Sequence, residues 1–510
     1  MLLPLVFLMV AFYVLPRINL KLNPINYFDS RSYKYLVLIF LFYLSLIIFL
    51  KFSKLYHYNY VLFDSGLYVN KLFKIAQEYS LNDKMHLALI AGHFQPLLLL
   101  YSVIFEYIPH PQYILFALES IVIASGIFPI FYLSMHKVDD FRISILICII
   151  YLLYPLTSFN DILGFHPDHI VLPCILFAFY FLEVGKYTYL TISLVIISLT
   201  SEPWVPLVCF FGIYLIVSIK KYRLGFFISI SALIYFLVVY FYFLRQAGAG
   251  DSGYIFSDTN SPYINLIEFD ISAMISDFNL RKLFYLYFIF LPFLLIPLLR
   301  PTYFIVAIPE FAKALLSNEP LHYAIEGHYT LGIIGCLFPA FVGGIQLIRE
   351  RLSYLIALKI TTLCLCMTFI FSILHSCFPW SRDFWSLSSN GDFNIQNYLS
   401  SERSDSLAKI DNYFANVPDD SRVQISNSAY FSNIARKNLL LFPGNDWKNS
   451  DYIILSNTGR DITGAISTHS EFIANLKDSK KQLPNFFYLI YSDGFFDVWA
   501  NDMIDAKVMN

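Results

Sequence analysis

The sequence predicts an α-helical protein that crosses a membrane many times and carries a separate soluble α/β domain at its C-terminal end. Of its 510 residues, 57% are hydrophobic and only 14% are charged, whereas soluble domains carry about 25% charged residues. The apolar residues form continuous runs and rarely alternate with polar ones, which favours a helical bundle over a β-barrel. The runs stop near residue 376, and a mixed composition follows.

The apolar runs give about eleven candidate membrane spans. They cover residues 34–52, 112–134, 143–156, 168–184, 187–200, 203–219, 224–244, 282–299, 302–316, 329–348 and 352–376. Residues 2–15 form a further apolar run without the basic start of a signal peptide, and we interpret it as a retained helix or a re-entrant segment. We therefore expect about 11–13 transmembrane helices.

Basic residues cluster in every second turn of the predicted bundle. These turns lie at 17–34, 137–142, 186, 220–223, 300 and 349–351. The positive-inside rule places them in the cytoplasm. The alternate turns contain no Lys or Arg and are predicted to lie outside; they are 157–167, 201–202 and 317–328.

By the same alternation, two longer segments, 53–111 and 245–281, are predicted to lie outside the cytoplasm, although they contain basic residues. This alternation of loops between the cytoplasm and the outside holds only if residues 87–108 do not cross the membrane. We therefore expect an amphipathic or re-entrant helix there, lying in the outer leaflet.

These patterns divide the chain into three parts. Residues 1–33 are predicted to form an N-terminal hydrophobic helix and a cytoplasmic linker, and residues 34–376 the transmembrane domain. Within the latter, residues 53–111 form a first outer loop with membrane-parallel helices. Residues 377–510 form a soluble α/β domain outside the cytoplasm, so we expect a multi-pass protein of the cell membrane.

The C-terminal part has the signals of a small α/β domain. Helical patterns lie at 401–414 and 470–480, strand patterns at 423–426 and 452–455, a short apolar run at 439–442, and a hairpin at 486–499 around an Asp-Gly turn. It contains no glycine-rich phosphate loop and no nucleophile elbow. The seven cysteines of the chain lie mostly in apolar runs, so no disulfide framework is predicted.

Polar sequences interrupt the apolar runs on the predicted outer side. They are FDSG (63–66), GHF (92–94), GFHPDH (164–169), SEP (201–203) and EGHY (326–329). Each has a local explanation: Asp64 suits a turn, Asp168 a helix cap, and Glu202 a helix start before proline. Because charged groups cost free energy at a membrane boundary, their recurrence on one face indicates a site.

His166, Asp168 and His169 lie close enough in sequence to bind a divalent cation or a phosphate. Two histidines and a carboxylate suit zinc or manganese, and magnesium is a third candidate. Asp168 also suits the cap of a helix that starts near His169. The two interpretations are compatible.

The five polar sequences follow, in order, the motifs of the DUF2079 membrane proteins, in which we expect FDxG, HFSP, FHPE, KED and HY. The tail resembles that family too, at 410–428 and 451–455, and the similarity spans residues 55–460. The DUF2079 family in turn resembles the GT-C glycosyltransferases, which use polyprenyl-phosphate sugars as donors.

The resemblance implies a GT-C-like membrane glycosyltransferase that moves a sugar from a polyprenyl-phosphate donor to a glycan, lipid or protein acceptor on the outer face. It implies Asp64 as the catalytic base of an inverting attack. Substrate-binding residues would be His93, Gln95, His166, Asp168, Glu202, His328, Tyr329, Arg245 and Arg281. The net charge of −2 predicts no nucleic-acid partner.

The sequence departs from the family pattern at two places. Val69 stands where the family has a second acid, and Ser201-Glu202-Pro203 replaces Lys-Glu-Asp. The missing lysine leaves the neutralisation of a phosphate to Arg245, Arg281, Lys71 or a metal.

Two other functions compete with sugar transfer. A transporter or flippase of a lipid-linked or small polar substrate is the first, although the polar residues gather at one face and no inverted repeat is visible. A structural role for an outer domain on an inert anchor is the second.

Overall fold

The computed structural model describes residues 30–59, 63–77, 93–108, 110–244, 278–385, 393–418, 420–426, 438–442, 447–456 and 487–501. The predicted segment 2–15, the helix predicted at 470–480 and Arg245 lie outside these residues. The backbone of Asp64 is described, but its side chain is not.

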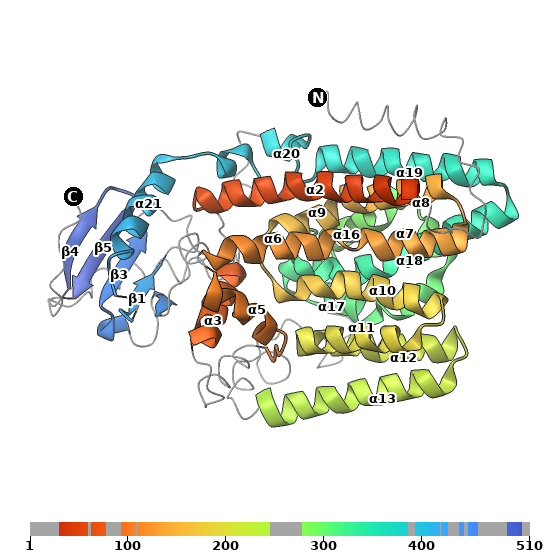
Figure 1. The fold of residues 1–510 in the computed structure, drawn as a ribbon, viewed down its shortest axis with the longest axis horizontal. Helices are drawn as coiled ribbons and strands as arrows, with labels where there is room; N and C mark the ends of the chain where they lie inside the picture. Colours follow the sequence, from red (N-terminus) through yellow and green to blue (C-terminus); the bar gives the residue numbers. More distant parts are fainter. Residues whose placement is uncertain are drawn as a thin grey trace.

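Most of the described chain forms a bundle of roughly aligned helices (Figure 1). They are α2 (Ser30–Tyr56), α6 (Pro111–Ala124), α7 (Ile127–Val138), α8 (Phe141–Leu153), α9 (Pro155–Ile162), α10 (Val171–Glu183), α11 (Tyr187–Thr200), α12 (Val205–Val217), α13 (Tyr222–Val238), α16 (Leu280–Phe290), α17 (Ile308–Leu316), α18 (Leu331–Arg351) and α19 (Tyr354–Leu374). The most apolar stretch of the helix 328–351 is 89% buried, against 22% for that of 222–243. The first is therefore a central helix, and the second presents its apolar side chains to lipid.

Five of the described helices are long and apolar enough to cross a membrane on their own. They are Tyr33–Tyr56, Pro111–Val138, Tyr222–Phe243, His328–Arg351 and Tyr354–Leu374. The pair α8 and α9, bent by 49°, would make a sixth span. The predicted fold class, a multi-pass helical membrane protein with a separate C-terminal sheet region, is confirmed, and the number of about 11–13 spans stays a prediction.

Residues 282–316 do not form the two continuous helices predicted at 282–299 and 302–316. Helix α16 ends at Phe290, and α17 is only nine residues long. Between them lie the 3-10 turns η6 (Leu291–Phe293), η7 (Ile296–Leu299) and η8 (Pro301–Ile305). Each turn has a proline in its first positions, and proline lacks the N–H that an α-helix needs.

Glycines allow α12 and α13 to pack closely. A Cβ added at Gly225 would lie 2.5 Å from the carbonyl oxygen of Gly212, and one at Gly212 would lie 2.2 Å from Ser229 Oγ. Small residues are typical of such contacts between membrane helices, because they let the two backbones approach.

The first outer loop contributes two short helices, α3 (Phe63–Gln77) and α5 (Leu98–Tyr107). They pack together around Leu72, Leu98 and Phe165, which are all buried. At ten residues α5 is about 15 Å long, half of the roughly 30 Å hydrocarbon core. The helix in the described part of 87–108 is thus too short to cross the membrane. The predicted alternation of loops between the two sides requires that it does not cross.

The turns that carry basic residues meet at one end of the bundle. Lys137 Nζ lies 2.6 Å from Glu183 Oε1, which joins the end of α7 to the end of α10. Lys221 Nζ lies 5.4 Å from the centre of the Tyr187 ring. The turns grouped by charge in the sequence are therefore neighbours in space (Figure 1).

The C-terminal part forms a five-stranded sheet of order β2-β1-β3-β5-β4. Its elements are α21 (Glu402–Phe414), β1 (Val423–Ile425), β2 (Leu439–Leu441), β3 (Tyr452–Ser456), β4 (Phe487–Ser492) and β5 (Phe496–Asn501). Strands β2, β1 and β3 are parallel, and β4 and β5 form an antiparallel hairpin. The turn of this hairpin contains Gly494 with φ 87°, which glycine adopts without strain. The predicted helix 401–414, the strands and the hairpin are confirmed.

The sheet lies at the end of the bundle opposite the basic turns, beside α3 (Figure 1). Two hydrogen bonds join it to the end of α2: Ser53 Oγ donates to the Tyr398 carbonyl at 2.8 Å, and Tyr58 Oη donates to Asp411 Oδ2 at 2.6 Å. The C-terminal part therefore packs against the end of the bundle that lacks the basic turns.

We expect a membrane-impermeant maleimide to label Asn412→Cys, on exposed α21, in intact cells, and Lys186→Cys only after permeabilisation, because the positive-inside rule places Lys186 in the cytoplasm. The native cysteines are buried or half-buried, so the wild-type protein gives the background signal. Labelling of the two variants in the reverse pattern would show that the orientation is inverted.

Candidate functional site

A short loop between α9 and α10 carries the first site residues. Gly164 has φ 112°, a conformation that glycine adopts readily, and the chain then enters the 3-10 turn η3 (Pro167–Ile170). His166 Nδ1 accepts a hydrogen bond from the Asp168 backbone N–H at 3.3 Å, which caps that turn. The cap of this turn is therefore His166 and not Asp168, which the sequence had suggested, and the loop holds two buried polar side chains close together.

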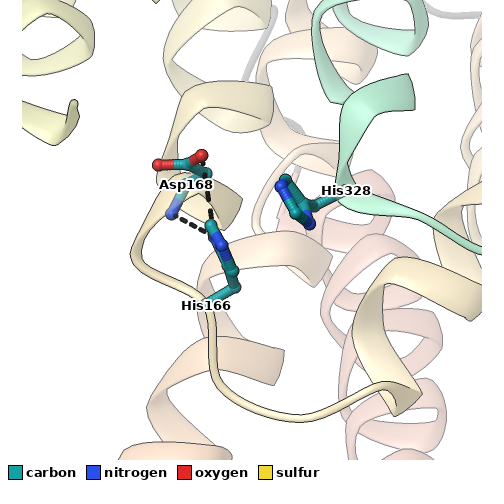
Figure 2. A group of neighbouring side chains, drawn as sticks. All are labelled: His166, Asp168 and His328. Carbon is teal, nitrogen blue, oxygen red and sulfur yellow. Dashed lines mark hydrogen bonds and ion pairs between the residues drawn. The ribbon is translucent and has the colours of Figure 1, made fainter. Parts of the chain in front are cut away.

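His166, Asp168 and His328 form a group at this end of the bundle, hereafter the His–Asp–His cluster (Figure 2). One donor atom of each lies within 4.8 Å of those of the other two. The two imidazoles are stacked, with ring centroids 3.9 Å apart. Asp168 Oδ2 lies 3.6 Å from His166 Nδ1, and Asp168 Oδ1 accepts a hydrogen bond from Ser201 Oγ at 3.0 Å.

His93 and Glu202 form an ion pair beside this cluster. His93 Nδ1 lies 2.6 Å from Glu202 Oε1, and the Phe94 N–H donates to Glu202 Oε2 at 2.8 Å. Burial acts to lower the pKa of His93, but the hydrogen bond and charge of Glu202 outweigh it and raise that pKa above its usual value. The pair fixes the start of the segment that leads into α5.

Lys71 brings a cation to the same end of the bundle. Its Nζ donates to Gln95 Oε1 at 3.1 Å, and Gln95 Nε2 donates to the hydroxyl of Tyr68 at 3.0 Å. The Tyr68 ring meets the His166 ring edge-on at 4.8 Å. Burial lowers the pKa of Lys71 to about 8, although Glu202 acts in the opposite direction.

The sequence offered Arg245, Arg281 and Lys71 as candidate cations for neutralising a phosphate. Of these, Lys71 lies among the site residues. Arg281 is exposed in the first turn of α16, and Arg245 lies outside the described residues. A second lysine, Lys313, sits over the Trp204 ring at 4.7 Å and donates to the Pro203 carbonyl at 3.3 Å. It thus reaches the SEP sequence, where this chain lacks the lysine of the family motif.

Tyr329 lies at the edge of the cluster. Its ring contacts the rings of His328 and His322, with centroids 4.2 and 4.6 Å away. His322 Nδ1 lies 2.7 Å from Ser317 Oγ, and burial lowers the pKa of His322 to about 4. His322 is therefore neutral at physiological pH.

A buried ion cluster, absent from the predicted site, lies behind these residues. Lys51 Nζ is 2.6 Å from Glu119 Oε2 and 2.9 Å from Asp161 Oδ1, and the three side chains are at most 1% exposed. Two hydroxyls complete it: those of Tyr43 and Ser120 donate to Asp161 at 3.0 and 2.5 Å. The signal in the sequence was a charged residue inside two of the apolar runs, Lys51 in 34–52 and Glu119 in 112–134.

Glu119 joins this ion cluster to the histidine loop. Its Oε1 accepts a hydrogen bond from the His166 backbone N–H at 2.8 Å and also contacts His169 Nδ1. The sequence grouped His169 with His166 and Asp168 as metal ligands. The structure instead pairs His169 with Glu119 and brings His328 into the group, because η3 turns consecutive side chains to different sides.

Asp64 lies in the first turn of α3, but its side chain is outside the description. The next residue is informative: Ser65 Oγ donates to the Phe165 carbonyl at 3.4 Å. The FDSG sequence therefore contacts the loop that carries His166, and its assignment as base stays a prediction.

The model of a family described as a predicted membrane protein, DUF2079, matches residues 54–481. This chain belongs to the DUF2079 family. No curated protein matches this DUF2079 protein. Among solved structures, it is similar to the crystal structure of ArnT from Cupriavidus metallidurans in the apo state, at 11% sequence identity and a TM-score of 0.49, over 91% of this chain and 97% of that one. A structural similarity of this strength does not support a functional assignment, so the function is argued from the geometry of the site.

We expect Lys51→Met to destabilise the protein strongly, because it leaves two carboxylates buried without their cation; breaking such a pair costs about 3–5 kcal/mol. Thermal unfolding of the detergent-purified protein measures the effect. Lys186→Met, which removes an exposed lysine, is the matched control and should unfold like the wild type. An unchanged unfolding temperature in Lys51→Met would show that the ion cluster does not hold the bundle.

Proposed function

We propose that this DUF2079 protein is a membrane glycosyltransferase that moves a sugar from a polyprenyl-phosphate donor to an acceptor on the outer face of the cell membrane. One observation carries the proposal: segments far apart in the sequence bring a histidine–glutamate pair, a half-buried lysine and the His–Asp–His cluster to one end of an apolar bundle. That end is opposite the basic turns and carries the sheet domain (Figure 1).

Sugar transfer from a lipid phosphate needs three groups that such a site would supply. A base takes the proton of the acceptor hydroxyl as its oxygen attacks the anomeric carbon, and we assign this role to Asp64. The bond between that carbon and the phosphate oxygen breaks, and the lipid phosphate leaves with the electron pair. A cation stabilises the charge that develops on this phosphate, and we assign this role to Lys71, a half-buried cation among the described site residues.

The remaining site residues would bind and orient the two substrates. Gln95 holds the Lys71 ammonium, and Glu202 holds His93 as a donor. The imidazole of His328 and the ring of Tyr329 offer hydrogen bonds and an apolar face to a sugar. Arg245 and Arg281, on the segment that follows α13, remain candidates for contacts to the lipid phosphate.

We expect Asp64→Asn to lower sugar transfer by about 10²–10⁴-fold, because the amide cannot accept the proton of the acceptor hydroxyl. The measurement is transfer of labelled sugars from a panel of polyprenyl-phosphate donors in membranes that contain the protein. Asp139→Asn is a matched control, since Asp139 is exposed at the end of α7 near the basic turns, in a left-handed conformation that Asn also tolerates.

Two outcomes would count against different parts of this proposal. Wild-type transfer by Asp64→Asn would remove Asp64 as the base while leaving the activity. If the wild type transfers no sugar from any lipid-linked donor but moves such a donor across vesicle membranes, the protein is a flippase.

We expect binding of a polyprenyl phosphate to weaken as the pH rises through about 8, where the half-buried Lys71 loses its proton. The sign follows from the charge: below this pKa the ammonium attracts the phosphate, and above it the neutral amine does not. Fluorescence or thermophoresis titrations at several pH values measure the affinity.

Two variants separate Lys71 from other titrating groups. Lys71→Met should bind weakly at every pH, and Lys71→Arg should bind without the step near pH 8, because its guanidinium stays charged. A step of the same size in Lys71→Met would assign the titration to another residue.

A further inference from the structure

The charge of Asp168 lacks a cationic partner in the described part of the chain. Its carboxylate contacts Ser201 Oγ and the ring of His166, and no Lys or Arg of the described residues forms an ion pair with it. His166 Nδ1 accepts the Asp168 N–H, so this nitrogen carries a lone pair and no proton. A buried carboxylate, on a side chain 9% exposed, is thus left beside two stacked imidazoles without a compensating charge.

We propose that His166, Asp168 and His328 bind a divalent transition-metal ion. The donor atoms already lie within 4.8 Å of one another (Figure 2), so small side-chain rotations would bring them to one ion. The ion supplies the positive charge that the buried carboxylate lacks. His166 and Asp168 are buried and His328 is half-buried, and a buried anion beside a nitrogen lone pair is costly without such an ion.

The donor set selects the kind of ion. Two imidazole nitrogens and one carboxylate oxygen suit zinc, cobalt or manganese, whereas magnesium prefers oxygen ligands alone. Three protein ligands leave at least one coordination position open, as in catalytic metal sites. If the proposed function holds, a phosphate oxygen of the donor would take that position, and the ion would act together with Lys71.

Glu119 gives this site its support. Its carboxylate holds the His166 backbone N–H and the His169 ring, and Lys51 holds Glu119 in turn. The loop that presents His166 and Asp168 is therefore fixed by the buried ion cluster, as residues around a metal site commonly fix its ligands. His169 acts in this support and is not a ligand.

The test measures metal binding and needs no activity. The purified full-length protein in detergent is stripped with a chelator, loaded with Zn²⁺ or Co²⁺, and analysed by elemental mass spectrometry and absorption spectroscopy. We expect one ion per chain, and a loss of affinity of at least about tenfold in Asp168→Asn and His328→Gln. His375→Gln is the matched control, since His375 pairs with Asp383 outside the cluster, and should bind like the wild type.

A variant that gains a spectroscopic signal distinguishes the loss of a metal ligand from the loss of metal binding through misfolding. His328→Cys should bind Co²⁺ and add a thiolate-to-cobalt charge-transfer band that the wild type lacks, because a cysteine replaces one nitrogen ligand. Cobalt binding without this band would exclude His328 as a ligand. Failure of the wild type to bind either Zn²⁺ or Co²⁺ would overturn the proposal, whereas metal binding without sugar transfer would overturn only the proposed function.

Discussion

The buried ion cluster of Lys51, Glu119 and Asp161 is the interaction on which the other features of the structure depend. It ties α2, α6 and α9 together through side chains that are at most 1% exposed, and loss of Lys51 would leave two buried carboxylates without their cation. Glu119 extends it to His166 and His169. One set of charges thus sets both the packing of the helices and the position of the histidine loop.

The two ends of the bundle differ in chemistry for a physical reason. The turns rich in Lys and Arg lie at the end that the positive-inside rule assigns to the cytoplasm, where Lys137 pairs with Glu183. At the other end charged side chains are held in specific pairs, such as half-buried His93 with buried Glu202. Short helices such as α3 and α5 make this possible, because they enclose polar side chains that a spanning helix would expose to lipid.

The departure from the family motif at residues 201–203 has a structural counterpart. Ser201 donates its hydroxyl to Asp168, and two lysines from other segments stand nearby: Lys71 by way of Gln95, and Lys313 over Trp204. Lys313 is itself paired with Glu310, at 2.8 Å between Nζ and Oε2.

The sequence by itself determined the membrane class, the grouping of the basic turns, the sheet domain and most of the polar residues of the site, because hydropathy and charge act locally along the chain. The tertiary structure decided what depends on contacts between distant segments. It replaced His169 by His328 in the cluster, placed Lys71 in the site, revealed the partners of Lys51, and broke residues 282–316 into short turns. Buried charges are stabilised by pairing with opposite charges. The partners of Lys51 come from distant segments, so no short stretch of the sequence contains both members of these pairs.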